Sequence, residues 1–414
     1  MTRAGTSLAA RYLREPLPII APVLLVLALG HVGTYIDGAD RYALASWAHS
    51  VSTVFLIAPV VGASAAWSVS RLRSAGFLER RWPRGRAAIY LDATWVSAAT
   101  GLLVIAVTGL IAAGFTAPPP ALVALAALAI MQMVALGVLL GRFLAGIYSA
   151  PLTLLGGYLW MVMPMAFEPL WLRHLNGHWP DCCSVPYEPS LRGLGAVAAV
   201  SIGLSVIALL YAGRLTRGRI ALSLVAAAVA AATASYLAAP LGGEPVQARS
   251  NGLKCAPLGH DGASLCLFTE HEPERTLAED AYRRAYDAWP GAKALRGSVF
   301  TEMVDPATNQ HVVQFGRSLS DSSAVAEFAG AVLPPVPICA PGKPYANGLL
   351  RETAMVALVS RATGSLPMAD QGAIPPEDEV LVEQIFAYGA DAFSEWLKDV
   401  SATVSQCDRE GISS

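Results

Sequence analysis

The chain is poor in charged residues, and its N-terminal part contains no lysine. Asp, Glu, Lys and Arg make up 14% of the 414 residues, against roughly 25% in soluble domains. Residues 1–240 hold 16 Arg, no Lys and 8 acidic residues, a net charge of +8, whereas residues 241–414 hold 13 Lys and Arg and 23 acidic residues, a net charge of −10. The shortage of charge excludes an ordinary soluble protein, and the split predicts a basic membrane half followed by an acidic soluble half.

The motifs of common nucleotide-binding and hydrolytic sites are also missing. The chain has no G-x-x-x-x-G-K-[ST], the loop that cradles nucleotide phosphates, and no G-x-S-x-G, the pattern of a nucleophile elbow. His271 and Glu272 open an H-E-P-E-R run, but Arg275 stands where a zinc peptidase needs its second His. His260-Asp261 fits an ordinary turn. We therefore expect no enzyme activity, no catalytic residue and no cofactor.

Long apolar stretches are what the first 240 residues do contain. Each of them comes near the ~20 residues that a helix needs to cross a bilayer. Gly137 and Gly141 form a G-x-x-x-G in the fourth stretch, which favours close helix packing. The sequence predicts an α-helical polytopic membrane protein whose transmembrane domain, residues 17–240, has about seven spans, near 17–36, 49–70, 93–115, 119–141, 148–168, 193–213 and 219–240.

The distribution of Arg predicts the orientation of these spans. If the chain crosses the membrane at every stretch, thirteen of the 16 Arg fall on one side and only Arg41, Arg173 and Arg192 on the other. By the positive-inside rule, the side with thirteen is cytoplasmic. We therefore expect a multi-pass plasma-membrane protein with a cytoplasmic N-terminal amphipathic segment, residues 1–16, and an extracytoplasmic soluble domain, residues 241–414.

The six cysteines all fall in segments placed on the outer side. An even set confined to that side predicts disulfides, which persist there and are rare in the cytosol. We favour Cys255–Cys266, whose spacing suits neighbouring strands, and Cys339–Cys407, which would tie a loop to the last helix. For the adjacent residues 182 and 183 two alternatives stay open, a bond with each other or with a separate partner.

The outer loop that holds the adjacent cysteines is also a weak candidate for a metal site. Two His four residues apart share a face of a helix, and imidazole with thiolate suits zinc or copper. Against a metal, Gly177 and Pro180 weaken helix continuity, and an oxidising compartment favours disulfides. We therefore prefer a disulfide-fixed loop to a metal centre built from His174, His178, Asp181, Cys182 and Cys183.

The outer domain is predicted to be a small α+β domain. Residues 252–259 and 264–270 flank H-D-G-A and predict a hairpin with a Gly-containing turn. Two further strands, near 297–303 and 311–316, flank the turn-rich D-P-A-T-N-Q. Helices are expected near 274–289, 322–332, 348–363, 377–387 and 390–405.

Two segments of the membrane half carry the more specific signals. The predicted inner loop R-L-R-S-A-G-F-L-E-R-R-W-P-R-G-R, residues 71–86, mixes six Arg with large apolar residues, so it either lies along the membrane surface or docks a cytoplasmic partner. On the outer side, Pro164 and Pro169 bracket Glu168. Proline removes a helix hydrogen bond, and an acidic residue near a membrane is a functional candidate, with simple interfacial exposure as the alternative.

With the short amphipathic stretch from Leu8 to Pro18, these two segments make residues 1–213 resemble the permeases of type-2 ABC exporters. The Arg- and Ala-rich membrane part with its Cys-bearing outer domain is similar to permease-like membrane proteins of actinobacteria. The resemblance implies an outer hairpin at 164–191, a homodimer or permease heterodimer, and a separate cytoplasmic ATP-binding cassette ATPase. That ATPase would dock on Arg71, Arg73, Glu79, Arg80, Arg81, Trp82, Arg84 and Arg86. The seventh span and the C-terminal domain depart from the family.

Three functions are therefore compared. The leading expectation is an ABC permease-like subunit that acts on an unidentified substrate with a separate ATP-binding subunit. The alternative is a membrane-anchored extracytoplasmic binding or sensor module without transport. The third is a polytopic metalloenzyme. A nucleic-acid partner is not expected.

Overall fold

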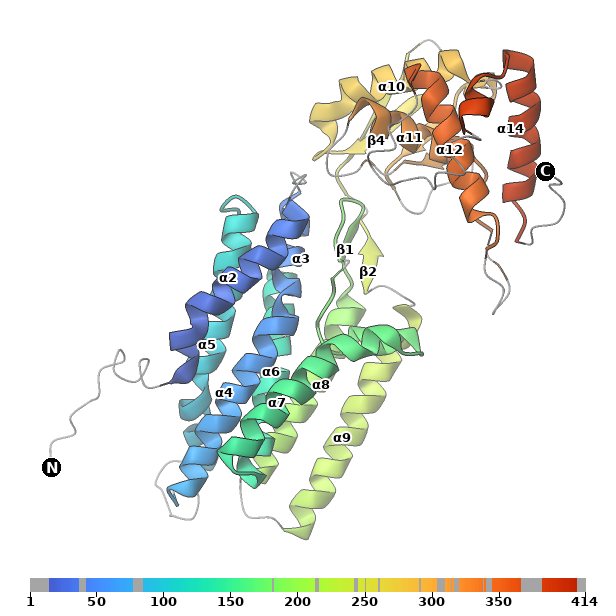
Figure 1. Ribbon diagram of the computed structural model, residues 1–414. Helices are drawn as coiled ribbons and strands as arrows, with labels where there is room; N and C mark the ends of the chain where they lie inside the picture. The colour runs from blue at the N-terminus through green and yellow to red at the C-terminus, as the bar shows by residue number, and fades with distance from the viewer. Residues whose placement is uncertain are drawn as a thin grey trace. The chain divides into compact units, whose positions relative to one another are not determined.

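The computed structural model divides the chain into two compact units, Met1–Gln247 and Ala248–Ser414 (Figure 1). Residues 1–14 of the predicted N-terminal segment lie outside the described residues, as do residues 377–381 of the helix predicted near 377–387, whereas residues 382–386 are helical. The structure describes residues 15–36, 42–76, 85–180, 182–212, 216–241, 245–249, 251–259, 261–289, 292–303, 310–313, 315, 320–337, 339, 345–365 and 382–407.

The N-terminal unit is a bundle of helices (Figure 1). Within the described part of the chain, seven helical stretches are long and apolar enough to cross a membrane, and each overlaps one predicted span. The helices are α2 (Pro16–Ile36), α3 (Ala43–Ser52), α4 (Val54–Ser74), α5 (Arg86–Ala112), α6 (Pro120–Phe143), α7 (Gly146–Val162), α8 (Leu191–Tyr211) and α9 (Arg217–Ala238).

The helix boundaries differ from the predicted spans in three places. The second span is preceded by the short helix α3, which is separated from α4 at Thr53. The inner loop predicted at 71–86 is shorter than expected, because α4 continues to Ser74 and α5 begins at Arg86. Helix α7 ends at Val162, before the predicted end at 168, since Pro164 has no N–H to donate to the carbonyl of the preceding turn. A short 3₁₀ helix, η1 (Met163–Ala166), follows it.

Helix α4 lies at the centre of the bundle and meets α6 at backbone distance. The G-x-x-x-G of α6 faces a small-residue pair with the same spacing on α4. A Cβ added at Gly137 would lie 2.1 Å from Gly62 O, and one added at Gly141 would lie 2.4 Å from Ala66 O. No side chain fits at either site. The glycines therefore join two helices of the same chain, as small residues do where helices approach closely in lipid.

Helix α9 also packs closely through small residues, and its close contact is with α8. A Cβ added at Gly203 of α8 would lie 2.4 Å from the Cβ of Ala230 on α9. Only 11% of the apolar window of α9 is buried, against 67% for α4. The Ala-rich helix α9 therefore lies at the edge of the bundle, and α4 forms the core of the bundle.

The C-terminal unit contains a four-stranded sheet covered by helices. The strands follow the order β3 (Leu253–Pro257), β4 (Ser264–Phe268), β5 (Val299–Thr301) and β6 (Gln310–Val312). The predicted hairpin is β3–β4, with Cys255 opposite Cys266. Strands β4, β5 and β6 pair in parallel, which the expectation of a simple α+β domain did not include. Helix α10 (Arg275–Ala288) connects β4 to β5, because neighbouring parallel strands need a crossover.

Aromatic rings fill the space between this sheet and its helices. Phe300 of β5 lies 5.3 Å from Tyr282 of α10 and 5.1 Å from Phe328, ring centroid to ring centroid. All three rings are buried and meet edge to face, a favourable arrangement for aromatic pairs. The remaining helices of this unit match their predicted ranges and are α11 (Asp321–Val332), α12 (Gly348–Thr363) and α14 (Ala390–Val404).

Replacing Gly141 by Leu tests the contact between α4 and α6. The leucine side chain cannot occupy the place of the Ala66 carbonyl, so the helices must separate, at a cost of about 1–3 kcal/mol or more. We expect a clearly lower melting temperature of the detergent-purified full-length protein. Gly156→Leu is the control, because a Cβ at Gly156 meets nothing within 4 Å. Equal melting temperatures for the two variants would contradict the contact.

Candidate functional site

The Arg-bearing end of α4 is tied to the junction of α6 and α7. Arg73 donates through Nη1 to Phe143 O at 2.6 Å and to Arg142 O at 3.4 Å. These carbonyls belong to the last turn of α6, where the helix itself supplies no partner and a cation is favourable. Ser70 Oγ adds a bond to Leu144 O at 3.3 Å. The start of the Arg-rich connection is therefore fixed to a neighbouring helix.

The other predicted docking residues are distributed as follows. Arg71 is exposed in the last turn of α4, and Arg86 is the first residue of α5. A ring contact of 5.6 Å between Phe143 and Tyr211 brings the end of α8 to the same end of the bundle. Five members of the proposed set lie outside the described residues, namely Glu79, Arg80, Arg81, Trp82 and Arg84.

At the opposite end of the bundle, the segment after α7 folds back between the helices. Gln132 of α6 is fully buried and donates through Nε2 to Leu175 O at 2.9 Å and to Val197 O at 3.4 Å. Its Oε1 accepts a bond from Trp160 Nε1 at 3.1 Å. One amide therefore connects α6, α7, the segment after α7 and α8, with both of its ends bonded.

Asn176, in the segment after α7, provides hydrogen bonds to the carbonyls at the end of α7. Its Nδ2 donates to Trp160 O and to Met161 O, both at 2.9 Å. Trp160 O is the carbonyl that Pro164, without an N–H, leaves free. Asn176 Oδ1 in turn accepts from His178 N at 2.9 Å. The interruption of helix α7 near Pro164 is thus compensated by hydrogen bonds from the buried side chain of Asn176.

The outer hairpin residues named from the sequence lie beside this network but outside its hydrogen bonds. Pro164 is buried in η1, whereas Glu168 and Pro169 are exposed. The exposure of Glu168 agrees with the interfacial alternative. Sequence reasoning missed Gln132 and Asn176, although Gln132 is the only amide in the apolar stretch 119–141 and would have marked α6.

The cysteines of the outer loop form a disulfide rather than a thiolate pair. Cys182 and Cys183 are buried and bonded to each other, so their sulfurs are not available as metal ligands. The ring of His178 lies 5.0 Å from that of Phe55, and His174 is fully buried. Asp181 lies outside the described residues. Among the residues that are described, no group of three or more His, Cys, Asp and Glu could hold a metal ion.

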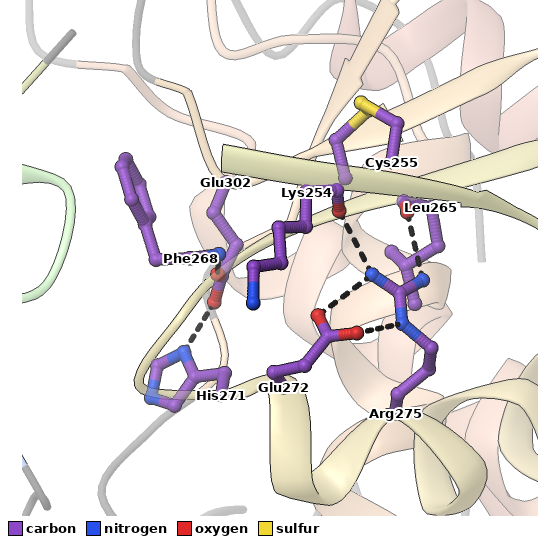
Figure 2. A network of polar contacts seen from close by, with 9 residues as sticks. Lys254, Cys255, Leu265, Phe268, His271, Glu272, Arg275 and Glu302 are labelled. Atoms are coloured by element: carbon purple, nitrogen blue, oxygen red, sulfur yellow. Dashed lines mark hydrogen bonds and ion pairs between the residues drawn. A yellow bond between two sulfur atoms is a disulfide. The ribbon is translucent and has the colours of Figure 1, made fainter. Parts of the chain in front are cut away.

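The C-terminal unit contains a buried carboxylate with two donors (Figure 2). Glu302 follows β5 and is 1% exposed. Its Oε2 accepts a bond from Phe268 N at 2.7 Å, and its Oε1 lies 2.5 Å from His271 Nδ1, as Figure 2 shows. The end of β4 and the turn after it are thereby held against the end of β5. A buried carboxyl group of this kind requires hydrogen-bond partners.

The other half of the H-E-P-E-R run makes a separate ion pair. Arg275 donates to both carboxylate oxygens of Glu272, at 3.0 and 2.9 Å, and also to Leu265 O and Lys254 O (Figure 2). Hydrogen bonding from Arg275 holds the pKa of Glu272 below its ordinary value. The guanidinium therefore fixes the β3–β4 hairpin to the first turn of α10, and His271 and Glu272 face different partners.

A third polar contact anchors the turn of the hairpin. Tyr282 of α10 donates to Asp261 Oδ2, and Ala263 N donates to Asp261 Oδ1 at 3.2 Å. Burial, and then the bond to Asp261, raise the pKa of Tyr282. Asp261 thus has a structural role in the turn, and His260 lies outside the described residues.

The disulfides of this unit are the two pairings that the sequence favoured. Cys255–Cys266 joins β3 to β4. Cys339–Cys407 joins the segment after α11 to the end of α14, across a sequence separation of 68 residues. Closing so long a loop restricts the unfolded chain more than closing a short one.

Comparison with known proteins finds one family. Residues 265–407 match a family described as Domain of unknown function (DUF7224). No curated protein and no solved structure matches the chain. The match begins in β4, includes His271 and Glu302, and ends at Cys407, so it lies wholly within the C-terminal unit. The N-terminal helices have no part in it.

Replacing Glu302 by Ala tests the buried network. Two buried donors, Phe268 N and His271 Nδ1, would lose this acceptor at roughly 1–3 kcal/mol each, so we expect the C-terminal unit to lose about 2–6 kcal/mol. Glu302→Gln should lose less, because its amide oxygen still accepts one bond. Pulse proteolysis of the full-length protein in urea measures both variants. Glu279→Ala, a change at a half-buried residue of α10, is the control. Equal losses of unfolding free energy in Glu302→Ala and in this control would contradict the network.

Proposed function

We propose that the chain is a multi-pass plasma-membrane protein with a cytoplasmic N-terminus and an extracytoplasmic C-terminal unit. The seven apolar helices support membrane insertion. The Arg residues at the ends of α4 and α6 and at the start of α9 support a cytoplasmic location for that end of the bundle. The disulfides of the C-terminal unit support an oxidising compartment on the other side.

The membrane unit functions, in this proposal, as a permease-like subunit of the type-2 ABC exporter kind. The observation that carries the proposal is the bond from Arg73 to the last turn of α6. The connection that would contact an ATPase leaves α4 directly after Arg73 and enters α5 at Arg86. A force on this connection would therefore act on α4, on α5 and, through Arg73, on the α6–α7 junction.

The outer side of the unit supports the same proposal. Helix α7 has 17 residues, or ~26 Å at 1.5 Å per residue, which is shorter than the ~30 Å hydrocarbon layer. The chain continues as an irregular segment, in which Leu175 O accepts from Gln132 and the side chain of Asn176 donates to the last turn of α7. Irregular backbone at membrane depth is tolerated where protein satisfies it. This segment corresponds to the outer hairpin expected at 164–191.

A partner must supply the energy for transport, because the chain has no phosphate-binding loop motif. The proposal therefore includes a separate cytoplasmic ATP-binding cassette ATPase and a second permease subunit, either another copy of this chain or a related one. The substrate is not specified by any residue described above.

A second candidate function is a membrane-anchored binding or sensor module on the outer side. The observation that favours it is the family match, which is confined to the C-terminal unit. This unit also has its own aromatic core and two disulfides. In this case the seven helices would serve as the anchor, and no ATPase would be needed.

Replacing Arg80, Arg81, Arg84 and Arg86 together by Ala separates the two candidates. If the connection docks an ATPase, the tagged variant should lose most of the ATP-binding cassette protein that co-purifies with the wild-type chain. Insertion should be unchanged, since other Arg residues remain on that side. Arg217→Ala with Arg219→Ala is the control, because it removes exposed positive charge from a different inner connection. Equal ATPase recovery in both variants, or none with the wild type, would contradict the permease proposal.

A further inference from the structure

Helix α4 reaches the surface of the bundle at one place, near its inner end. Between Val54 and Ser70, Trp67 is the only exposed residue, with 40% of its surface accessible. The next exposed residue is Arg71, one helical turn later. Residues four apart lie on the same face of a helix. The indole and the guanidinium therefore form one surface feature on an otherwise enclosed helix.

The start of α7 completes this surface. A Cβ added at Gly146 would lie 3.0 and 3.1 Å from two ring carbons of Trp67, so the missing side chain leaves room for the indole. The next two residues, Ile147 and Tyr148, are 70% and 64% exposed. An apolar strip thus extends from Trp67 along α7, with Arg71 at its inner edge.

The charge around Arg71 is positive. Arg73 is bonded to carbonyls of α6, and Arg142 is half-buried beside it. Among the described residues, no ion pair joins Arg71 to a carboxylate, and Glu15, the acid near this part of α4, accepts a hydrogen bond from Ser68 Oγ. The exposed guanidinium is suited to an anion, and its planar fork matches a phosphate.

We propose that Trp67, Arg71 and the first turn of α7 bind one anionic phospholipid, with its phosphate on Arg71 and an acyl chain along Trp67 and Ile147. The inference rests on the membrane orientation given under the proposed function. Trp is favoured at headgroup depth and Arg at the cytoplasmic interface. A zwitterionic lipid also carries a phosphate, but its ammonium group offsets that charge, so charge complementarity selects the anionic lipid.

Quenching of Trp67 fluorescence by brominated lipids tests the site in the full-length chain. The protein is reconstituted in nanodiscs of phosphatidylcholine with increasing brominated phosphatidylglycerol or brominated phosphatidylcholine, and the signal of Trp67 is taken as the difference from Trp67→Phe. We expect half-quenching at an about fivefold lower mole fraction of the anionic lipid, the effect of one interfacial Arg. Arg71→Gln should remove this preference, and Arg217→Gln, at the start of α9, should keep it.

Equal quenching of the wild-type chain by both lipids would overturn the site. A preference for the anionic lipid that survives Arg71→Gln, or that is lost in Arg217→Gln, would do the same. If the chain inserts with the expected orientation and yet shows one of these results, the lipid site is wrong and the membrane orientation stands. Failure of the wild-type chain to insert at all would contradict both. Because Arg71 is exposed, its replacement leaves the buried helix contacts in place.

Discussion

The backbone contact between α4 and α6 is the constraint on which the N-terminal unit depends. In the proposed lipid setting, helices gain little from the hydrophobic effect on meeting each other, so close van der Waals packing must hold them together. Gly62 and Ala66 on α4, with Gly137 and Gly141 on α6, allow that packing. With α6 against one side, α4 also contacts α5 and α7 and becomes the most enclosed helix of the bundle.

The second requirement is that every buried backbone carbonyl finds a donor. Pro164 ends α7 early, and the resulting irregular segment would leave carbonyls unbonded inside the unit. Gln132 and Asn176 supply the missing donors from α6 and from the segment itself. At the other end, Arg73 does the same for the last turn of α6. These three polar side chains thus lie where helices of the unit are interrupted or end.

Local sequence patterns predicted the helices well, because apolar runs and their flanking Arg are local signals. They also indicated the hairpin and the favoured disulfides. They did not predict the parallel pairing of β4 with β5, which depends on how α10 packs. Nor did they predict the partners of Gln132, which lie 28 to 65 positions away in the sequence. The G-x-x-x-G was visible, but its partner on α4 depends on the three-dimensional packing.

The proposed function depends on the orientation of the chain in the membrane, and protease protection in intact cells measures that orientation. A reporter fused after Ser414 and another inserted between α8 and α9 are compared in separate strains. We expect that external protease removes the reporter at Ser414 and spares the inserted one until the cells are lysed. Protection of the Ser414 reporter in intact cells, or cleavage of the inserted reporter, would contradict it.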